Sequence, residues 1–68
     1  MKLGVYKHYN GNVYRVVTTA KHSETLEDMV VYQDANDAKK VWVRPRKMFQ
    51  EKVEVNGKMV PRFKFIDD

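Results

Sequence analysis

The chain has no cysteine and only three glycines and two prolines among its 68 residues. Without cysteine it can form no disulfide, no thiolate zinc site and no thiol nucleophile. Its two histidines alone are too few for a histidine metal cage, so we expect neither a metal site nor a cofactor. Because glycine and proline are too scarce for a flexible linker, we expect residues 1–68 to form one folded domain.

Long apolar runs are also absent. No segment approaches the roughly 18 apolar residues of a membrane span, and residues 1–6 lack the apolar core of a signal peptide, so we expect a cytoplasmic protein. A chain this short commits most of its 43% hydrophobic residues to its own core and has little left for a deep active-site pocket. Lys and Arg number 13 against nine Asp and Glu, and the net charge of +4 favours anionic partners.

What the chain does contain is a series of short β-branched and aromatic runs separated by turn residues. Asn10-Gly11-Asn12 lies between two such runs, and Asn-Gly is a strong hairpin signal because both residues tolerate the positive φ of a type I′ turn. We expect strands over residues 4–9 and 13–21. Alternation in the second strand directs Tyr14 and Val16 toward the core.

The rest of the chain continues this pattern. Residues 34–40 are turn formers, Pro45 ends a strand because it lacks a backbone N–H, and residues 46–52 favour one short helical turn. Asn56-Gly57 predicts a second type I′ hairpin. The further strands that we expect are residues 29–33, 41–44, 53–55, 59–60 and 63–66.

Short antiparallel strands with tight turns must protect their edges, and the compact solution for a 68-residue chain is a small, strongly bent barrel. We therefore predict an all-β fold. In detail, we expect a small SH3-like barrel of five to six short antiparallel strands with one short helical or 3₁₀ turn.

Three motifs carry a resemblance to a known family: Tyr6-Lys-His-Tyr9, Trp42-Val-Arg-Pro45 and Pro61-Arg-Phe63. With these motifs in this order, the chain from Gly4 to about Ile66 resembles the bacterial family called domain of unknown function 1653. The resemblance implies a small bacterial β domain with an SH3-like barrel. It implies no catalytic residues, so function must be inferred from the side chains themselves.

The residue types of a catalytic or metal site are present but scattered. His8, His22 and Glu24 offer two imidazoles and a carboxylate, although nothing in the sequence shows that they converge. Ser23 and Thr25 lie beside His22, yet adjacent side chains of an extended segment point to opposite faces, and we expect both hydroxyls to bond local backbone. We expect no enzyme activity and no metal site.

The strongest functional signal is a basic segment around the single tryptophan, Trp42. Five cations without an intervening acid are spread over nine residues: Lys39, Lys40, Arg44, Arg46 and Lys47. Cations that neutralise phosphates and a ring that stacks a base are the features of single-stranded nucleic-acid binding. Tyr32 is a candidate second stacking ring. The simpler interpretation of the same residues is a solvated surface beside a core aromatic.

Two alternatives concern the orientation of this segment. Trp42 and Arg44 share one face of their strand, so either Trp42 lies in the core or the ring is exposed with Val41 and Val43 inside, which we favour. Arg44 and Arg62 both flank prolines and are held in extended backbone. Each could bind a phosphate, but we favour pairing inside the fold, with the acids Glu24, Glu27 or Glu51.

A protein partner is the alternative ligand. Small barrels bind peptides in aromatic-lined grooves or along strand edges, and four rings could line such a groove: Tyr6, Tyr9, Tyr32 and Trp42. Binding of this kind tolerates salt, whereas phosphate contacts weaken steeply as salt rises. The sequence thus predicts a non-enzymatic binding module for RNA or single-stranded DNA, with a protein-interaction module as the alternative.

Overall fold

The computed structural model describes residues 1–68 and contains seven strands and one short helix, all-β apart from that helix. Its elements are β1 Gly4–His8, β2 Val13–Lys21, β3 Asp28–Asp34, β4 Asp37–Pro45, α1 Arg46–Phe49, β5 Lys52–Val55, β6 Lys58–Pro61 and β7 Phe63–Asp67. The all-β class and the short helical turn are confirmed. The predicted number of five to six strands is too low, because each of the seven segments expected from the sequence forms a strand of its own, and β6 and β7, divided at Arg62, pair with different partners.

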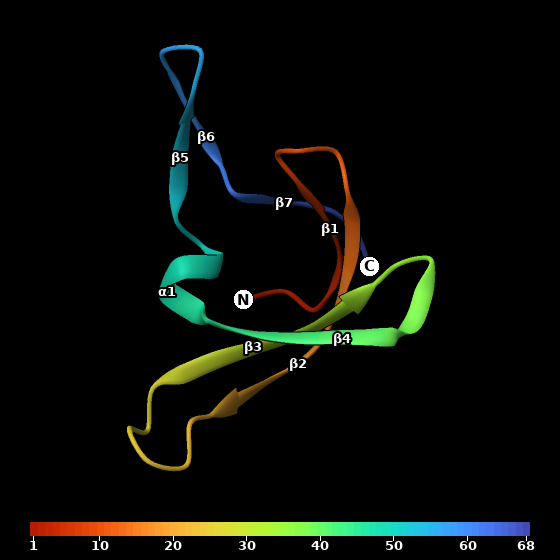
Figure 1. Cartoon of the computed structure of the whole chain (residues 1–68), viewed down its shortest axis with the longest axis vertical. Coiled ribbons are helices and arrows are strands. Elements are labelled where there is room, and N and C mark those ends of the chain that lie inside the picture. Colours follow the sequence, from red (N-terminus) through yellow and green to blue (C-terminus); the bar gives the residue numbers. More distant parts are fainter.

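Five strands form one antiparallel sheet in the order β4-β3-β2-β1-β7, and β5 and β6 pair only with each other. Figure 1 shows the β5–β6 hairpin standing away from this main sheet, with its tip pointing the same way as the tip of the β1–β2 hairpin. The main sheet is open, with β4 and β7 as its unpaired edges. The predicted closed SH3-like barrel is therefore not confirmed.

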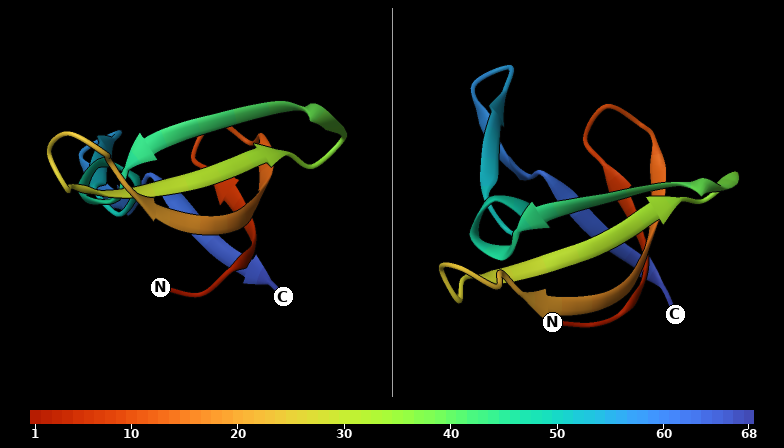
Figure 2. Two further views of the ribbon diagram at one scale, coloured as in Figure 1. Left: turned by 90° about the horizontal axis from the view of Figure 1, so that it is seen from below. Right: turned by 60° about the horizontal axis from the view of Figure 1, so that its bottom comes forward.

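The main sheet is nevertheless strongly bent (Figure 2). In β2 the pairing register shifts between Val16 and Thr18, which leaves Val17 as an extra residue opposite β3. Such a bulge bends its strand and increases its twist. Where β1 meets β7, Gly4 has φ of +134° and an added Cβ would lie 2.5 Å from the carbonyl oxygen of Asp67, so only glycine allows this close approach.

The two Asn-Gly turns differ. At the second hairpin Asn56 and Gly57 have φ of 51° and 80°, as the predicted type I′ turn requires. At the first hairpin only Gly11 has positive φ, and the N–H of His8 donates to the carbonyl of Asn12 at 2.8 Å. The type I′ prediction is wrong there because the loop that the His8–Asn12 bond closes has three residues, Tyr9, Asn10 and Gly11, and a loop of this length uses one left-handed glycine instead of two left-handed residues.

β4 begins at Asp37, four residues before the predicted start at Val41. The turn before it shrinks to Ala35 and Asn36, whose geometry is fixed by the carboxylate of Asp34 accepting the Asn36 N–H at 2.7 Å. Asp37 in turn accepts the N–H of Lys39 at 3.0 Å. Side-chain bonds of this kind let residues that favour turns occupy an irregular start of a strand.

The core lies on the inner, concave side of the bent sheet. It consists of six buried side chains: Tyr6, Val16, Val30, Tyr32, Phe49 and Phe63. Tyr14 packs against this cluster, so the predicted inward direction of Tyr14 and Val16 is confirmed. Pro45 ends β4 as predicted, and α1 then carries Phe49 over the core, where its ring stacks on Phe63 with centroids 4.0 Å apart. No helix is long and apolar enough to cross a membrane.

Candidate nucleic-acid interface

Trp42 lies at the rim of the inner face. It is the cross-strand partner of Tyr32, and its ring contacts Tyr32 at 5.9 Å and the edge of Tyr14 at 5.5 Å between centroids. Even so, 40% of the residue is exposed, because β4 is an edge strand. The ring is thus supported from behind while part of it stays open to solvent, as a stacking platform requires.

The favoured arrangement of β4, with an exposed Trp42 over inward-facing valines, is wrong in one respect. Val41 and Val43 lie on the outer face and are 51% and 58% exposed. The register that pairs Trp42 with Tyr32 fixes Trp42 on the core side and sends both valines outward. Trp42 is exposed only because the inner face ends beside it.

Tyr32 cannot serve as a stacking surface, because only 5% of it is exposed. Its ring makes edge contacts with the stacked rings of Phe49 and Phe63, and its hydroxyl accepts a hydrogen bond from Nε of Arg44 at 3.3 Å. The half-buried ring of Tyr14 takes the place expected for Tyr32 at the edge of the site. The alternation of β2 predicted only that Tyr14 faces the core. The pairing of β2 with β3 and of β3 with β4 is what sets Tyr14 beside Trp42, and this pairing has no signature in the local sequence.

The two arginines that flank prolines have different partners. Arg62 forms an ion pair with Glu51 at 3.1 Å, so the predicted internal pairing is confirmed for Arg62. Arg44 has no acidic partner: it donates to Tyr32 and lies over the ring of Phe63, 5.7 Å from the centroid. A guanidinium carries five N–H donors, which leaves Arg44 with donors free for a phosphate.

The five cations near Trp42 do not form one surface. Lys39 and Lys40 lie near the β3–β4 turn. The regular cross-strand pairing of β3 with β4 ends at Gln33 and Val41, before it reaches these lysines. At the other end of β4, Arg46 and Lys47 line a shallow hollow of about 420 Å³ together with two acids, Glu27 and Asp28. Arg44 is the cation of this set that contacts Tyr32, and Trp42 contacts Tyr32 as well.

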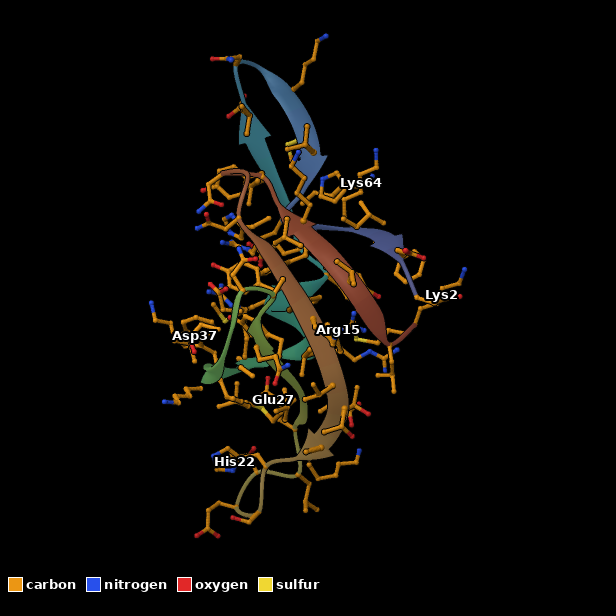
Figure 3. All side chains as sticks on the ribbon, turned by 90° about the vertical axis from the view of Figure 1, so that its right-hand side faces the viewer. Lys2, Arg15, His22, Glu27, Asp37 and Lys64 are labelled. Carbon is orange, nitrogen blue, oxygen red and sulfur yellow. The ribbon has the colours of Figure 1, made fainter.

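His8 and His22 are far apart, at opposite ends of β2. His8 ends β1 beside the first turn, whereas His22 follows β2 at its far end. Figure 3 shows His22 near the lower end of the molecule and Lys64 in its upper half; Lys64 follows Phe63, the cross-strand partner of His8. Nδ1 of His22 accepts the N–H groups of Glu24 and Thr25 at 3.1 and 3.3 Å. The structure therefore does not bring His8, His22 and Glu24 together, and it contains no other group of three side chains able to hold a metal.

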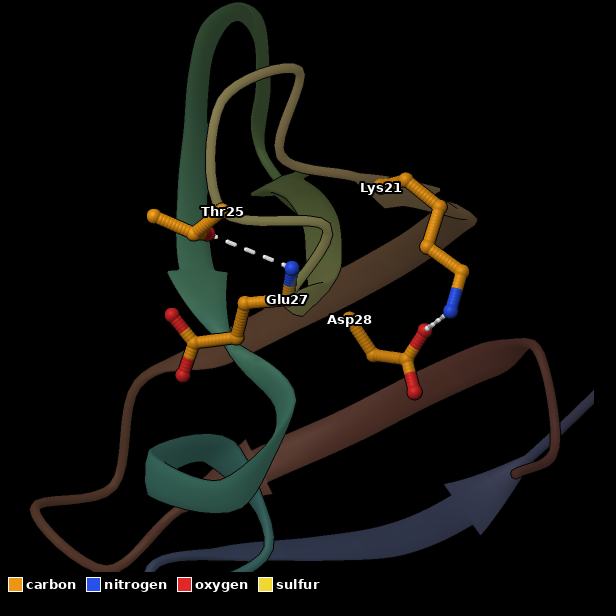
Figure 4. A network of polar contacts seen from close by, with 4 residues as sticks. All are labelled: Lys21, Thr25, Glu27 and Asp28. Atoms are coloured by element: carbon orange, nitrogen blue, oxygen red, sulfur yellow. Dashed lines mark hydrogen bonds and ion pairs between the residues drawn. The ribbon is translucent and has the colours of Figure 1, made fainter.

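The turn that carries His22 is held by local polar contacts (Figure 4). Lys21 and Asp28 form an ion pair at 2.6 Å, and the hydroxyl of Thr25 accepts the N–H of Glu27 at 3.2 Å. The expectation that this hydroxyl bonds local backbone is confirmed for Thr25. The lysine hydrogen bond and charge lower the pKa of Asp28 below its ordinary value.

Two further candidate rings lie along β1. Tyr6 is buried in the core and its hydroxyl donates to the carbonyl of Lys2 at 2.6 Å, so it cannot form part of a binding surface; burial also raises the pKa of Tyr6. Tyr9 is 51% exposed and its ring lies 4.4 Å from that of His8. Partial burial lowers the pKa of His8, and the charges of Arg44 and Arg62 lower it further.

Comparisons with known proteins place this chain among small proteins of one family. The family described as "Protein of unknown function (DUF1653)" matches residues 4–65. A crystal structure of a protein of that family from Bordetella bronchiseptica is similar, with 30% sequence identity, a TM-score of 0.87, and coverage of 98% of this chain and 88% of the other. No curated protein matches.

Proposed function

Because this chain belongs to the DUF1653 family, whose description assigns no activity, we propose a function from its own surface: a non-enzymatic module that binds single-stranded RNA or DNA. The observation that carries this proposal is the partly exposed ring of Trp42, supported by Tyr14 and Tyr32, beside an arginine without an acidic partner. Such a ligand also agrees with a location in the cytoplasm.

The energetics of this site favour a stacked base and a bound phosphate. A base stacked on an aromatic side chain contributes about 1–3 kcal/mol and tolerates any sequence. Arg44, whose guanidinium is held by Tyr32 and Phe63, is positioned without losing much further side-chain freedom on binding. The net charge of +4 adds a general attraction for polyanions.

The proposal that the module is not an enzyme rests on where its reactive side chains lie. His22 is engaged with the backbone of its own turn, and His8 lies at the other end of β2. Acid–base and nucleophilic catalysis require such groups to converge on one substrate. Their separation supports a binding role.

Fluorescence of the single tryptophan tests the proposal. Mixed-sequence single-stranded RNA and DNA are titrated into the protein at low and at moderate salt. We expect saturable quenching of Trp42 that weakens as salt rises, because phosphate contacts release counterions. No change in Trp42 fluorescence at low salt would contradict the proposal.

Variants separate the ring from the charge, with binding followed by the anisotropy of a labelled oligonucleotide. Trp42→Ala should weaken binding by about 1–3 kcal/mol. Val43→Ala, which truncates an exposed neighbour on the outer face, is the matched control and should bind like the wild type. Arg44→Lys keeps the charge but loses the planar fork, and it should bind more weakly than wild type but better than Arg44→Ala. Unchanged affinity of a folded Trp42→Ala variant would rule out stacking.

The alternative is a protein-interaction module of the SH3-like type, and one observation favours it. β4 is an open edge of the main sheet, and Val41 and Val43 are exposed along its outer face. An extended peptide could add to this edge through backbone hydrogen bonds. Binding of this kind would persist at high salt and would be lost on Val43→Lys, whereas nucleic-acid binding would not depend on Val43.

A further inference from the structure

A groove of about 590 Å³ opens between the end of β1, the β5–β6 hairpin and β7. Its charged side chains are three lysines, Lys7, Lys58 and Lys64. No acid lines it, although the chain has nine. Figure 3 shows Lys64 where β7 leaves the hairpin. The lining of this groove therefore has a net positive charge.

The groove and Trp42 are separate surfaces. Lys7 follows Tyr6, and Lys64 precedes Phe65; both of these rings lie on the core side, where they are cross-strand partners. Because successive side chains of a strand point to opposite faces, the two lysines point away from the core side. Trp42 lies on the core side of β4. A ligand of the lysines therefore does not need to contact Trp42.

The charge of the groove is not neutralised within the fold. Lys7 and Lys64 are direct cross-strand partners, an arrangement that destabilises a sheet when both residues carry the same charge. Neither of them takes part in an ion pair, and Lys58 does not either. An anionic group bound in the groove would relieve this repulsion.

The hairpin gives the groove an aliphatic wall. Val55 is the cross-strand partner of Lys58, and Val60 lies on the same face of the hairpin; both valines are half-buried. Pro61 extends this wall, and Tyr9 is the one exposed ring of the groove. Aliphatic walls fit aliphatic side chains, whereas single-stranded nucleic acids bind through a series of aromatic faces. Lysines beside valines therefore favour an acidic, aliphatic peptide over a nucleic acid.

We infer that the groove binds a partner protein through a short segment that combines acidic and aliphatic side chains. Its carboxylates pair with Lys7, Lys58 and Lys64, and its aliphatic side chains pack on Val55 and Val60. This inference goes beyond the proposed function, because it assigns a second ligand to a different face. The module can then hold a nucleic-acid strand and an acidic protein segment at the same time.

The probe for this inference is a short peptide of alternating Glu and Leu, titrated into isotope-labelled protein. We expect the amide resonances of the groove residues to shift, while the fluorescence of Trp42 stays unchanged. A peptide of alternating Glu and Ser has the same charge without the aliphatic side chains and should bind more weakly. Val55→Thr, which retains the β-branched shape but introduces a hydroxyl, should also weaken binding of the Glu–Leu peptide.

Lys64→Glu tests the charge of the groove. Its affinity for the Glu–Leu peptide should fall about fivefold or more, because one ion pair is lost and a repulsive charge is gained. The same variant should unfold at a higher temperature than the wild type, since Lys7 then faces an opposite charge. Lys52→Glu is the matched control: it makes the same change of charge on β5 outside the groove, and it should show neither effect.

Four results would overturn the inference: no resonance shift at millimolar peptide, shifts centred on Trp42, equal affinities of Lys64→Glu and Lys52→Glu, or equal binding of the two peptides. Displacement of the peptide by a single-stranded oligonucleotide would identify the groove as a phosphate site and overturn the peptide assignment. The proposed function fails separately, through the absence of Trp42 quenching by oligonucleotides.

Discussion

At the scale of single residues, His8 links the fold to the candidate site. Its Nδ1 accepts the backbone N–H of Asn10 at 3.1 Å, a bond that requires Nδ1 to be unprotonated. Burial and the nearby Arg44 and Arg62 lower its pKa, while the side chain of Asn10 acts in the opposite direction. The folded chain therefore favours the neutral imidazole.

This preference predicts that stability falls with pH. Unfolded chains protonate His8 near its ordinary pKa of 6.5, whereas the folded chain does so only at lower pH. Between these values the unfolded state binds more protons, so the free energy of unfolding decreases as pH falls. Urea unfolding from about pH 7 to about pH 5 should show this loss of stability, since histidine titrates in that range.

His8→Asn removes the titrating group and should flatten the pH dependence in this range. His22→Asn is the matched control and should keep the slope that His8 causes. The lowered pKa of Asp28 also makes stability decline with falling pH, but only below its ordinary value of 3.8, outside the range compared. An equal slope in wild type and His8→Asn would contradict the assignment to His8.

Sequence reasoning at this scale identified the important side chains better than their surroundings. Trp42 and Arg44 were placed correctly on one face by alternation, which is a local property of a strand. Whether that face is the core side depends on the pairing of β4 with β3, about ten residues away in the chain, and this pairing has no local signature. For the same reason Tyr32 was expected at the surface and Tyr14 was not expected beside Trp42.

At the scale of elements, α1 shows how a very short helix can be stable. Four residues are far too few for an isolated helix, whose nucleation is unfavourable. Phe49 compensates because it is only 1% exposed, stacks on Phe63 and contacts the edge of Tyr6. α1 thus acts mainly as a support for one buried ring.

Truncation of Phe49 should remove a large part of the free energy of unfolding and so increase the fraction of unfolded molecules. Phe49→Ala leaves a cavity at the centre of a small core and should cost about 3–5 kcal/mol. A chain of this length has about 3–10 kcal/mol in total at about 0.05–0.15 kcal/mol per residue. Urea denaturation followed by far-ultraviolet circular dichroism measures the difference. Met48→Ala, one residue earlier and largely exposed, should change stability by less than about 0.5 kcal/mol.

The elements themselves were largely predictable. β2 has the predicted bounds, β1 is one residue shorter than predicted, and β3 is one residue longer at each end. The start of β4 was missed because Asp34 and Asp37 resemble turn formers in the sequence and use their carboxylates to hold an irregular strand. The extra residue at Val17 has no sequence signature, because Val fits a regular strand as well as a bulge.

At the scale of the whole molecule, the motifs identified the family correctly but did not determine whether the sheet closes into a barrel. Closure of a barrel would require β4 and β7 to pair, and the two strands lie at opposite ends of the strand order. The need to protect strand edges in a compact chain predicted a barrel, and the family resemblance implied one as well. In the structure β5 and β6 pair with each other and α1 covers the core, so the fold buries its aromatic cluster without closing the sheet.

An open sheet must protect its edges from pairing with another molecule, and charged residues such as Lys are a common means. β4 carries Lys39 and Lys40 next to the exposed Val41 and Val43. This gives the two lysines a role that is independent of any ligand. We therefore expect Lys39→Gln/Lys40→Gln to associate at lower protein concentration than the wild type, as sedimentation velocity would measure.

The control for this prediction is Lys2→Gln/Lys47→Gln, which lowers the net charge equally but lies outside the strands of the main sheet. If both double variants associate alike, general charge repulsion rather than edge protection keeps the molecules apart. If only Lys39→Gln/Lys40→Gln associates, and if it still binds oligonucleotide with wild-type affinity at dilutions where it is monomeric, then Lys39 and Lys40 protect the edge of the sheet. Phosphate binding beside Trp42 would then be left to Arg44, which has no acidic partner.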